Sequence, residues 1–191
     1  MDQLKEELQK SILKINDLEK LRDNIEMTVT AEGLRIELLE SERGTFFDSG
    51  HSDLNGTGKE MVELLAQQLG QLPNHISVEG HTDAKPYTGG GNYDNWELSA
   101  DRANAARRLM QESRLRADQI SQVRGFADQR LHTPQNPLKP SNRRVSIIVQ
   151  YLRAEGTDDT KLQPEDAGTP KTSLRETHQS SGRSEPAVNK K

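Results

Sequence analysis

The chain has 191 residues and no cysteine, and its 26 Lys and Arg against 30 Asp and Glu give a formal net charge of −4. The lack of cysteine excludes disulfides, thiolate catalysis and cysteine-based zinc sites, and a slightly acidic chain without a basic stripe argues against a nucleic-acid partner. Hydrophobic residues make up 31% of it, below the ~45 to 50% of globular domains, a range that also counts glycine, so we expect one or two domains with much of the chain outside the core.

Residues 1–24 are typical of an amphipathic linker helix. Larger aliphatic residues recur at spacings of four and three, with charged residues between them. This stripe must pack against something, either the chain's own domain or the same helix of a second copy, and the run is too short to predict a coiled coil. The stripe consists of Leu4, Leu8, Ile12, Ile15, Leu18 and Leu21.

Residues 25–153 alternate strand-like and helix-like segments, and we predict that they form one domain. Strand-like segments have apolar residues at period two, and helix-like segments have them at spacings of three and four. Glu32 and Gly33 supply the turn of a β-hairpin, and Gly70 is the expected C-cap of the first helix. The predicted elements are a hairpin over 25–40, a helix over 59–70, a strand over 75–80, a helix over 94–112, and strands over 120–127 and 143–152.

The order ββαβαββ predicts a two-layer α/β sandwich, in which a mixed sheet has its helices on one face. The second helix starts with a capping-box pattern, because Asp94 is followed three residues later by Glu97. Small residues on one side of that helix suit close packing on a sheet. The residues expected to face the core are Met61, Leu65 and Leu69 on the first helix and Ala103, Ala106 and Met110 on the second.

Residues 154–191 are expected to be a disordered polar tail. They contain no aromatic residue, and their only larger aliphatic residues are Leu162, Leu174 and Val188. Such a segment cannot bury enough apolar surface to offset the entropy lost on ordering.

Four motifs occur in the order and at roughly the spacing found in the OmpA-like peptidoglycan-binding domain. They are VEGHTD (78–83), NWELSADRA (95–103), RGFAD (124–128) and NRRVSIIV (142–149). The resemblance covers about residues 45–152, and four motifs in register are much more specific than any one alone. It implies an OmpA-like fold and peptidoglycan binding without catalysis or cofactor.

Within that family, FFDSG (46–50) and the long loop before NWELSADRAN are similar to the MotB-like flagellar stator proteins. Proteins of that kind carry an N-terminal membrane helix with a proton-carrying aspartate, whereas this sequence contains no apolar run of about 18 residues. The resemblance therefore implies a periplasmic piece, tethered to the inner membrane in the full-length protein. It also implies a homodimer and the stator partner MotA, which would be contacted through the membrane segment. An outer-membrane or lipoprotein-type tether outside the motor is the alternative within the family.

The stretch GHTDAKPYTGGGNYDNWELSADRA (80–103) places an aspartate and an arginine on either side of a glycine-rich loop. Diaminopimelate in peptidoglycan stem peptides presents an ammonium and a carboxylate on the same carbon. Asp83 can accept bonds from the ammonium, and the planar fork of Arg102 can hold the carboxylate through two parallel hydrogen bonds. Free backbone N–H groups near Asn95 to Leu98 are expected to meet ligand oxygens.

The resemblance adds further residues to the predicted peptidoglycan site. Thr82 either bonds within its own turn or offers its hydroxyl to the ligand. Arg143 and Arg144 lie on opposite faces of one strand, so at most one of them points at the site. Trp96 is interpreted as a packing anchor rather than a sugar platform. The remaining residues expected to line the pocket are Asp48, Asn95, Leu98 and Arg143.

Two alternatives come from other functional classes. A metal hydrolase would use His81 and Asp83 with His51 or His75, but a His-x-Asp pattern without HExxH or comparable ligand spacing is weak evidence, so neither metal nor catalysis is expected. In a protein–protein interaction module, Asp83 and Arg102 would instead bond to each other inside the domain.

Overall fold

A mixed β-sheet forms the centre of the fold in the computed structural model, which describes residues 1–13, 23–42, 45–48, 50–88 and 90–152. Its five strands lie in the order β1-β2-β5-β3-β4, with β3 and β4 parallel and every other neighbouring pair antiparallel. The predicted order ββαβαββ and the mixed sheet are both confirmed. The strands are β1 (Ile25–Val29), β2 (Gly33–Leu39), β3 (Ile76–His81), β4 (Ile120–Gly125) and β5 (Arg144–Gln150).

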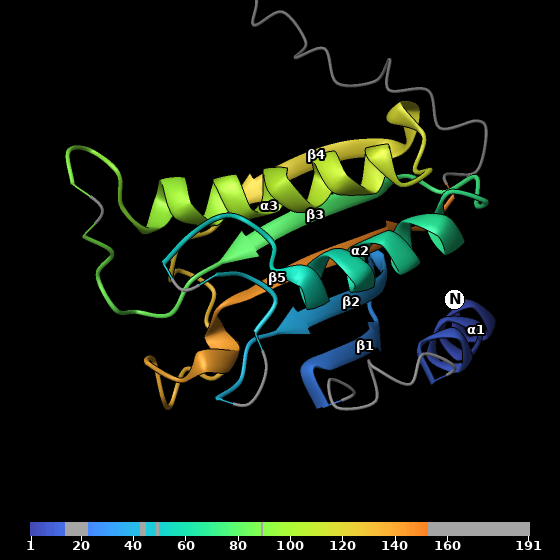
Figure 1. Ribbon diagram of the computed structural model, residues 1–191. Helices are drawn as coiled ribbons and strands as arrows, with labels where there is room; N and C mark the ends of the chain where they lie inside the picture. The colour runs from blue at the N-terminus through green and yellow to red at the C-terminus, as the bar shows by residue number, and fades with distance from the viewer. Residues whose placement is uncertain (14–22, 43–44, 49, 89, 153–191) are drawn as a thin grey trace, which may run out of the picture. The chain divides into compact units, whose positions relative to one another are not determined.

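Two helices, α2 (Gly56–Leu69) and α3 (Asn95–Glu112), cover one face of the sheet (Figure 1). Helix α2 begins earlier than predicted because the Asn55 side chain caps it by accepting a hydrogen bond from the Gly58 N–H at 2.8 Å. Helix α3 has the predicted capping box formed by Asp94 and Glu97. All the predicted core residues on both helices are fully buried, so the two-layer sandwich is confirmed.

Helix α3 lies very close to β3, and this sets the geometry of the site described below. A Cβ atom placed on Gly80 would come within 1.9 Å of the Ser99 carbonyl oxygen, so only glycine permits this approach. The contact brings the segment just after β3 alongside the first turns of α3. As a result, Asp83 and Arg102, each three residues beyond a contact residue, lie on the same side of the molecule.

The N-terminal helix α1 (Asp2–Leu13) packs on its own domain through at least part of its apolar stripe. Leu8 is 1% exposed and belongs to the same core cluster as Met61 and Leu65 of α2, while Leu4 is partly buried against that cluster. Packing on the chain's own domain is therefore confirmed for Leu8. The rest of the stripe and the polar tail lie outside the residues whose side chains are described.

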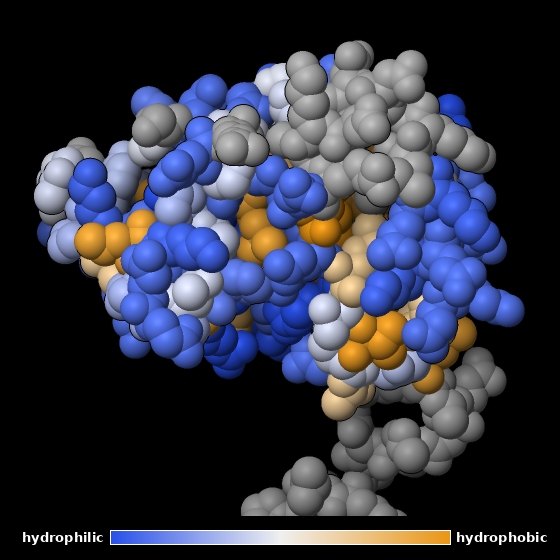
Figure 2. Space-filling view, turned by 90° about the horizontal axis from the view of Figure 1, so that it is seen from below, coloured by the Kyte–Doolittle hydropathy of each residue, from blue (hydrophilic) through white to orange (hydrophobic). Residues whose placement is uncertain are grey.

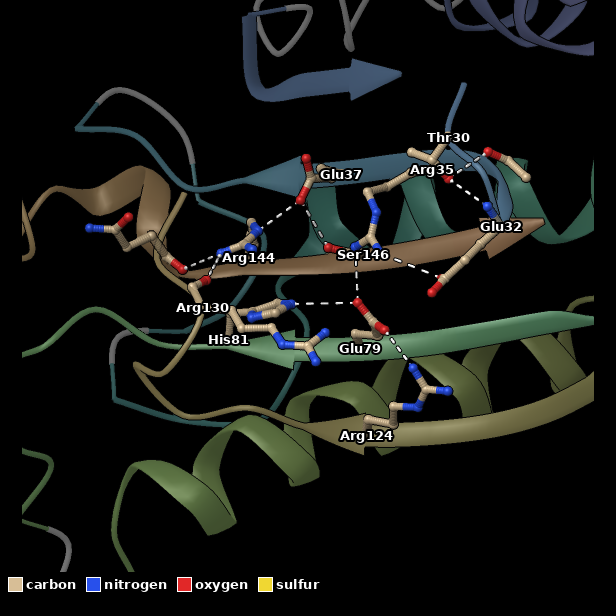
Figure 3. Close-up of polar contacts among 12 residues, drawn as sticks. Thr30, Glu32, Arg35, Glu37, Glu79, His81, Arg124, Arg130, Arg144 and Ser146 are labelled. Carbon is tan, nitrogen blue, oxygen red and sulfur yellow. Dashed lines mark hydrogen bonds and ion pairs between the residues drawn. The ribbon is translucent and has the colours of Figure 1, made fainter. Parts of the chain in front are cut away.

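The second face of the sheet, turned away from α2 and α3, carries charged and polar side chains (Figure 3). The Glu79 carboxylate accepts hydrogen bonds from Arg35 at 2.9 Å and Arg124 at 3.2 Å. Burial alone would raise the pKa of Glu79, but the nearby His81, whose Nε2 lies 3.8 Å from Glu79 Oε2, and the hydrogen bond and charge of Arg35 lower it to about 2. His81 is buried beside Glu79, and burial lowers its pKa.

Hydrophilic residues dominate the described part of the face seen from below, where hydrophobic residues form separate patches (Figure 2). Among the described residues, the large hydrophobic side chains that remain exposed are Trp96, Leu138, Tyr151 and Leu152. None of the helices in this part of the chain is long and apolar enough to cross a membrane.

Candidate functional site

A cavity of about 390 Å³ is lined by residues from α3, from the loops after β2 and β3, and by Arg143 just before β5. It contains six of the seven residues that the sequence singled out, including both Asp83 and Arg102. The six are Thr82, Asp83, Asn95, Leu98, Arg102 and Arg143.

Arg102 is the buried cation of this cavity, with an exposed fraction of 3%. Its Nε donates a hydrogen bond to the His51 carbonyl oxygen at 3.0 Å, and its guanidinium carbon lies 4.9 Å from the centre of the Phe47 ring. Burial lowers the pKa of Arg102, and the Glu40 carboxylate opposes that shift. These contacts fix the plane of the guanidinium and leave its two terminal nitrogens without a hydrogen bond among the described residues.

Arg143 connects two carboxylates in the same cavity. Its Nε donates to Glu40 Oε2 at 2.5 Å, and its Nη1 donates to Asp83 Oδ2 at 2.6 Å. Burial alone would lower the pKa of Arg143, but hydrogen bonds to Glu40 and Asp83 raise it. The other Glu40 oxygen lies 4.0 Å from Arg102 Nη1. Charges therefore alternate along the row Arg102, Glu40, Arg143 and Asp83, which we call the charge row.

Glu40 is a site residue that the sequence analysis missed. It directly follows β2, and its N–H donates to the Arg143 carbonyl oxygen at 3.0 Å, one position beyond the last β2–β5 pair, Leu39 with Arg144. Its side chain is buried. A charged residue ending an apolar strand was the available signal, but its partner depends on the β2–β5 register, which the sequence alone does not specify.

Thr82 lines this cavity, and its buried hydroxyl has no protein partner within the described residues. Its side chain is 2% exposed, and its hydroxyl oxygen finds no hydrogen-bond partner within the described residues. Buried polar groups are nearly always bonded, so such an atom points to a ligand or an ordered water. Of the two readings of Thr82, the bond within its own turn is not made.

Residues 46–139 match the OmpA family model. The chain carries an OmpA family domain. Over 139 residues it is 37% identical to Motility protein B of Escherichia coli K12, a match that covers 72% of this chain and 45% of that protein. The chain spans about half the length of the curated relatives it matches.

Solved structures share the fold of this OmpA family domain. The putative MotB-like protein of Desulfovibrio vulgaris aligns with a TM-score of 0.64 at 16% identity, over 78% of this chain and 92% of that one. The periplasmic domain of Helicobacter pylori MotB (residues 90–256) aligns with a TM-score of 0.58 at 21% identity, over 67% and 80% of the two chains. The predicted resemblance to OmpA-like domains of the MotB type is confirmed.

The glycine-rich loop of the OmpA family domain turns where predicted. Gly90 and Gly91 have φ values of +89° and +64°, a backbone region that glycine enters without strain. Beyond them, the Asn95 side-chain amide donates to the Lys85 carbonyl oxygen at 3.1 Å. Before the glycines, the Tyr87 hydroxyl donates to the Gly50 carbonyl oxygen at 2.8 Å. This bond connects the loop to the segment after β2, and both residues line the cavity.

The expectation of free N–H groups at the start of α3 is wrong for most of that turn. The Trp96 N–H donates to Asp94 Oδ1 at 2.6 Å, the Glu97 N–H also bonds the Asp94 side chain, and the Leu98 N–H donates to the Asp94 carbonyl oxygen at 3.0 Å. The capping box thus uses the donors that a ligand would need. The first turn of α3 therefore has few backbone donors left for a ligand.

Two other residues differ from their predicted places. Asp48 is exposed and is not among the lining residues; its backbone instead forms a turn, in which the His51 N–H donates to the Asp48 carbonyl oxygen at 3.0 Å. Trp96 is 49% exposed, so it is not the packing anchor that was expected. Trp96 lies two residues after the cap residue Asp94, in the first turn of α3.

Residues of the alternative metal hydrolase do not come together. His81 stacks on Phe126, with ring centroids 5.2 Å apart, and contacts Glu79 on the second face of the sheet, whereas Asp83 lines the cavity. Within the described part of the chain, converging ligand atoms of three or more such side chains occur at Glu26, Glu37 and His132 instead.

Proposed function

We propose that this OmpA family domain binds peptidoglycan without catalysis, by holding the ammonium and carboxylate of a diaminopimelate residue between Asp83 and Arg102. The observation that carries the proposal is that both residues line one cavity together with Thr82, whose buried hydroxyl has no partner within the described residues. An interaction module in which Asp83 and Arg102 bond to each other is less well supported, because Asp83 bonds Arg143 and Arg102 bonds the His51 carbonyl.

The charge row suits a zwitterion of zero net charge. Within the charge row two guanidinium groups balance two carboxylates, so a ligand with one charge of each sign keeps that balance. Lys85 lines the same cavity and adds one positive charge outside the row. The free terminal nitrogens of Arg102 would take the carboxylate as a bidentate pair. Asp83 would accept the ammonium through the lone pairs that remain beside its bonds from Arg143 and the Lys85 N–H. Leu98, which is buried and lines the cavity, would contact the methylene chain.

We further propose that the domain anchors a flagellar stator to the cell wall. The similarity to Motility protein B of E. coli supports this role, and with it a periplasmic location and a tether to the inner membrane through a segment outside this chain. Partnership with MotA and a homodimer belong to the same proposal. Because Leu8 packs on its own domain, the dimer would have to rest on other surfaces or on the remainder of the stripe.

The expected affinity of one domain is low. Two charge-assisted contacts contribute roughly 1.5 to 3 kcal/mol each, which corresponds to a dissociation constant in the millimolar range before ordering costs. Two linked domains would increase the apparent affinity by orders of magnitude. This favours a dimer for an anchoring role.

Co-sedimentation with purified sacculi of the diaminopimelate type tests the proposal. Since Asp83 and Arg102 are 7% and 3% exposed, alanine variants would disturb the charge row. Asp83→Asn removes the negative charge and nearly keeps the size of the side chain. Arg102→Lys retains the positive charge and loses the planar fork. We expect the wild type to pellet and both variants to remain in the supernatant.

The matched controls are variants that carry the same substitutions at exposed positions. Arg108→Lys lies on the exposed side of α3 and Asp118→Asn lies in the 3-10 turn before β4, so both should pellet like the wild type. Circular dichroism would confirm that all four variants are folded. Equal pelleting of wild type, Asp83→Asn and Arg102→Lys would reject the proposed site.

A further inference from the structure

We propose that Glu26, Glu37 and His132 form a binding site for a divalent transition-metal ion of the zinc type, separate from the peptidoglycan site. One ligand atom from each of the three side chains lies within 4.8 Å of the other two. Two carboxylates and an imidazole are ligands that zinc accepts, and water would complete its coordination. The sequence analysis considered metal binding only around His81 and missed this group.

The two glutamates meet through the register of the sheet. Glu26 on β1 and Glu37 on β2 are direct partners in the antiparallel pair. Like charges placed directly opposite each other destabilise a strand pair. Arg144 already compensates part of the Glu37 charge through an ion pair at 2.8 Å, and a cation held between the two glutamates would offset the repulsion that remains. His132 is the third member, with its Nε2 3.6 Å from Glu26 Oε1.

Outer hydrogen bonds orient Glu37 as they orient metal-binding carboxylates. Its Oε1 accepts hydrogen bonds from Arg144 Nε at 2.8 Å and Ser146 Oγ at 3.1 Å. Figure 3 shows its other carboxylate oxygen pointing away from these two donors. These two bonds fix the orientation of the carboxylate and leave its other oxygen without a hydrogen bond among the described residues. In metal sites, hydrogen bonds of this kind orient the carboxylates that bind the metal.

The loop that carries His132 is held by a fully buried asparagine. Asn142 accepts a hydrogen bond from the Thr133 N–H at 2.8 Å, and its amide donates to the carbonyl oxygens of Asn136 and Pro137 at 2.9 and 3.0 Å. His132 therefore starts from a fixed backbone position beside β1. A ligand on a constrained loop needs little ordering when the metal binds.

An acidic cavity adjoins the group and offers access and room for water ligands. It has a volume of about 470 Å³ and includes Glu26 and His132 in its lining. Asp23, Glu40 and Glu42 also line it, with Lys139 as the one cation among the described lining residues. Carboxylates grouped around a cavity raise the local concentration of cations.

Isothermal titration calorimetry of the full chain with Zn²⁺ tests this site, with Mg²⁺ as the comparison ion. We expect one Zn²⁺ site in the wild type, a weakening of at least tenfold in Glu26→Gln and in His132→Ala, and no heat from Mg²⁺, which binds imidazole poorly. Zn²⁺ should also raise the Tm of the wild type, because it binds the folded state, and chelation should reverse the increase.

His75→Ala is the matched control, because His75 is an exposed histidine outside the group. It should bind Zn²⁺ like the wild type. Glu26 and His132 are both accessible to solvent, so their variants are expected to fold, and the Tm shift of the wild type reports on the site independently of any variant. Zn²⁺ affinity unchanged in Glu26→Gln and His132→Ala, or no Zn²⁺ binding by the wild type, would overturn the proposal.

Discussion

Replacing Glu40 with glutamine removes one charge from the charge row and nearly preserves the shape of the side chain. The Glu40 side chain is 5% exposed and contacts Arg143 Nε at 2.5 Å and Arg102 Nη1 at 4.0 Å. Breaking a buried ion pair typically costs about 3 to 5 kcal/mol, because an uncompensated charge is left behind. Arg143 is 29% exposed and keeps its bond to Asp83, so we expect the smaller loss of about 2 to 3 kcal/mol in the free energy of unfolding.

Urea denaturation at neutral pH would measure this loss. Glu32→Gln provides the control, because Glu32 is 59% exposed and lies 3.9 Å from Arg35, and an exposed pair of this kind contributes less than about 1 kcal/mol. We also expect weaker sacculus binding by Glu40→Gln, because Arg143 would lose its ion pair with Glu40 and would interact more strongly with Asp83. A difference of less than about 0.5 kcal/mol between Glu40→Gln and the wild type would refute the electrostatic account of the charge row.

Three further predictions concern stability. The pKa of Glu79 is lowered from 4.5 to about 2, so its stabilising contribution, about 3 kcal/mol at most, is fully present above pH 4.5 and lost as pH falls toward 2. Acid titrations of unfolding for wild type and Glu79→Gln should converge in that window, and parallel curves would contradict it. Burial lowers the pKa of His81 below 6.5. Neutral His81 therefore contributes stability that is complete above pH 6.5 and is lost as pH falls below that value. His81→Asn should flatten the pH dependence of thermal unfolding below pH 6.5. Asp94→Ala removes the cap of α3 and should lower the free energy of unfolding in urea by about 1 kcal/mol; no loss would show that the cap is dispensable.

Local patterns were enough to predict most of the fold. The capping box of Asp94 and Glu97 and the stripe of Ala103, Ala106 and Met110 depend only on near neighbours in the sequence, and α3 begins and ends where they indicate. The four family motifs identified the side chains that meet in the cavity. Arg143 is separated from Arg102 in the sequence by the rest of α3 and by β4, yet Asp83, Arg102 and Arg143 line one cavity.

Features that depend on strand register could not be predicted. Glu40 meets Arg143, and Glu26 meets Glu37, only because of how β2 pairs with β5 and β1. A shift of one residue would turn every side chain to the other face. The capping role of Asp94 was predicted from the sequence. Its consequence, that the Trp96 and Leu98 N–H groups are no longer available to a ligand, follows only from the observed hydrogen bonds.

The central claim is that Asp83 and Arg102 recognise an ammonium and a carboxylate on one carbon. The most direct measurement is a nuclear magnetic resonance titration with two stem tripeptides, one ending in diaminopimelate and one ending in lysine, which keeps the ammonium and lacks the second carboxylate. We predict millimolar-range binding of the diaminopimelate peptide, with shifts at Asp83 and Arg102, and at least tenfold weaker binding of the lysine peptide. Equal affinity for the two peptides, or shifts confined to residues outside the cavity, would contradict the account.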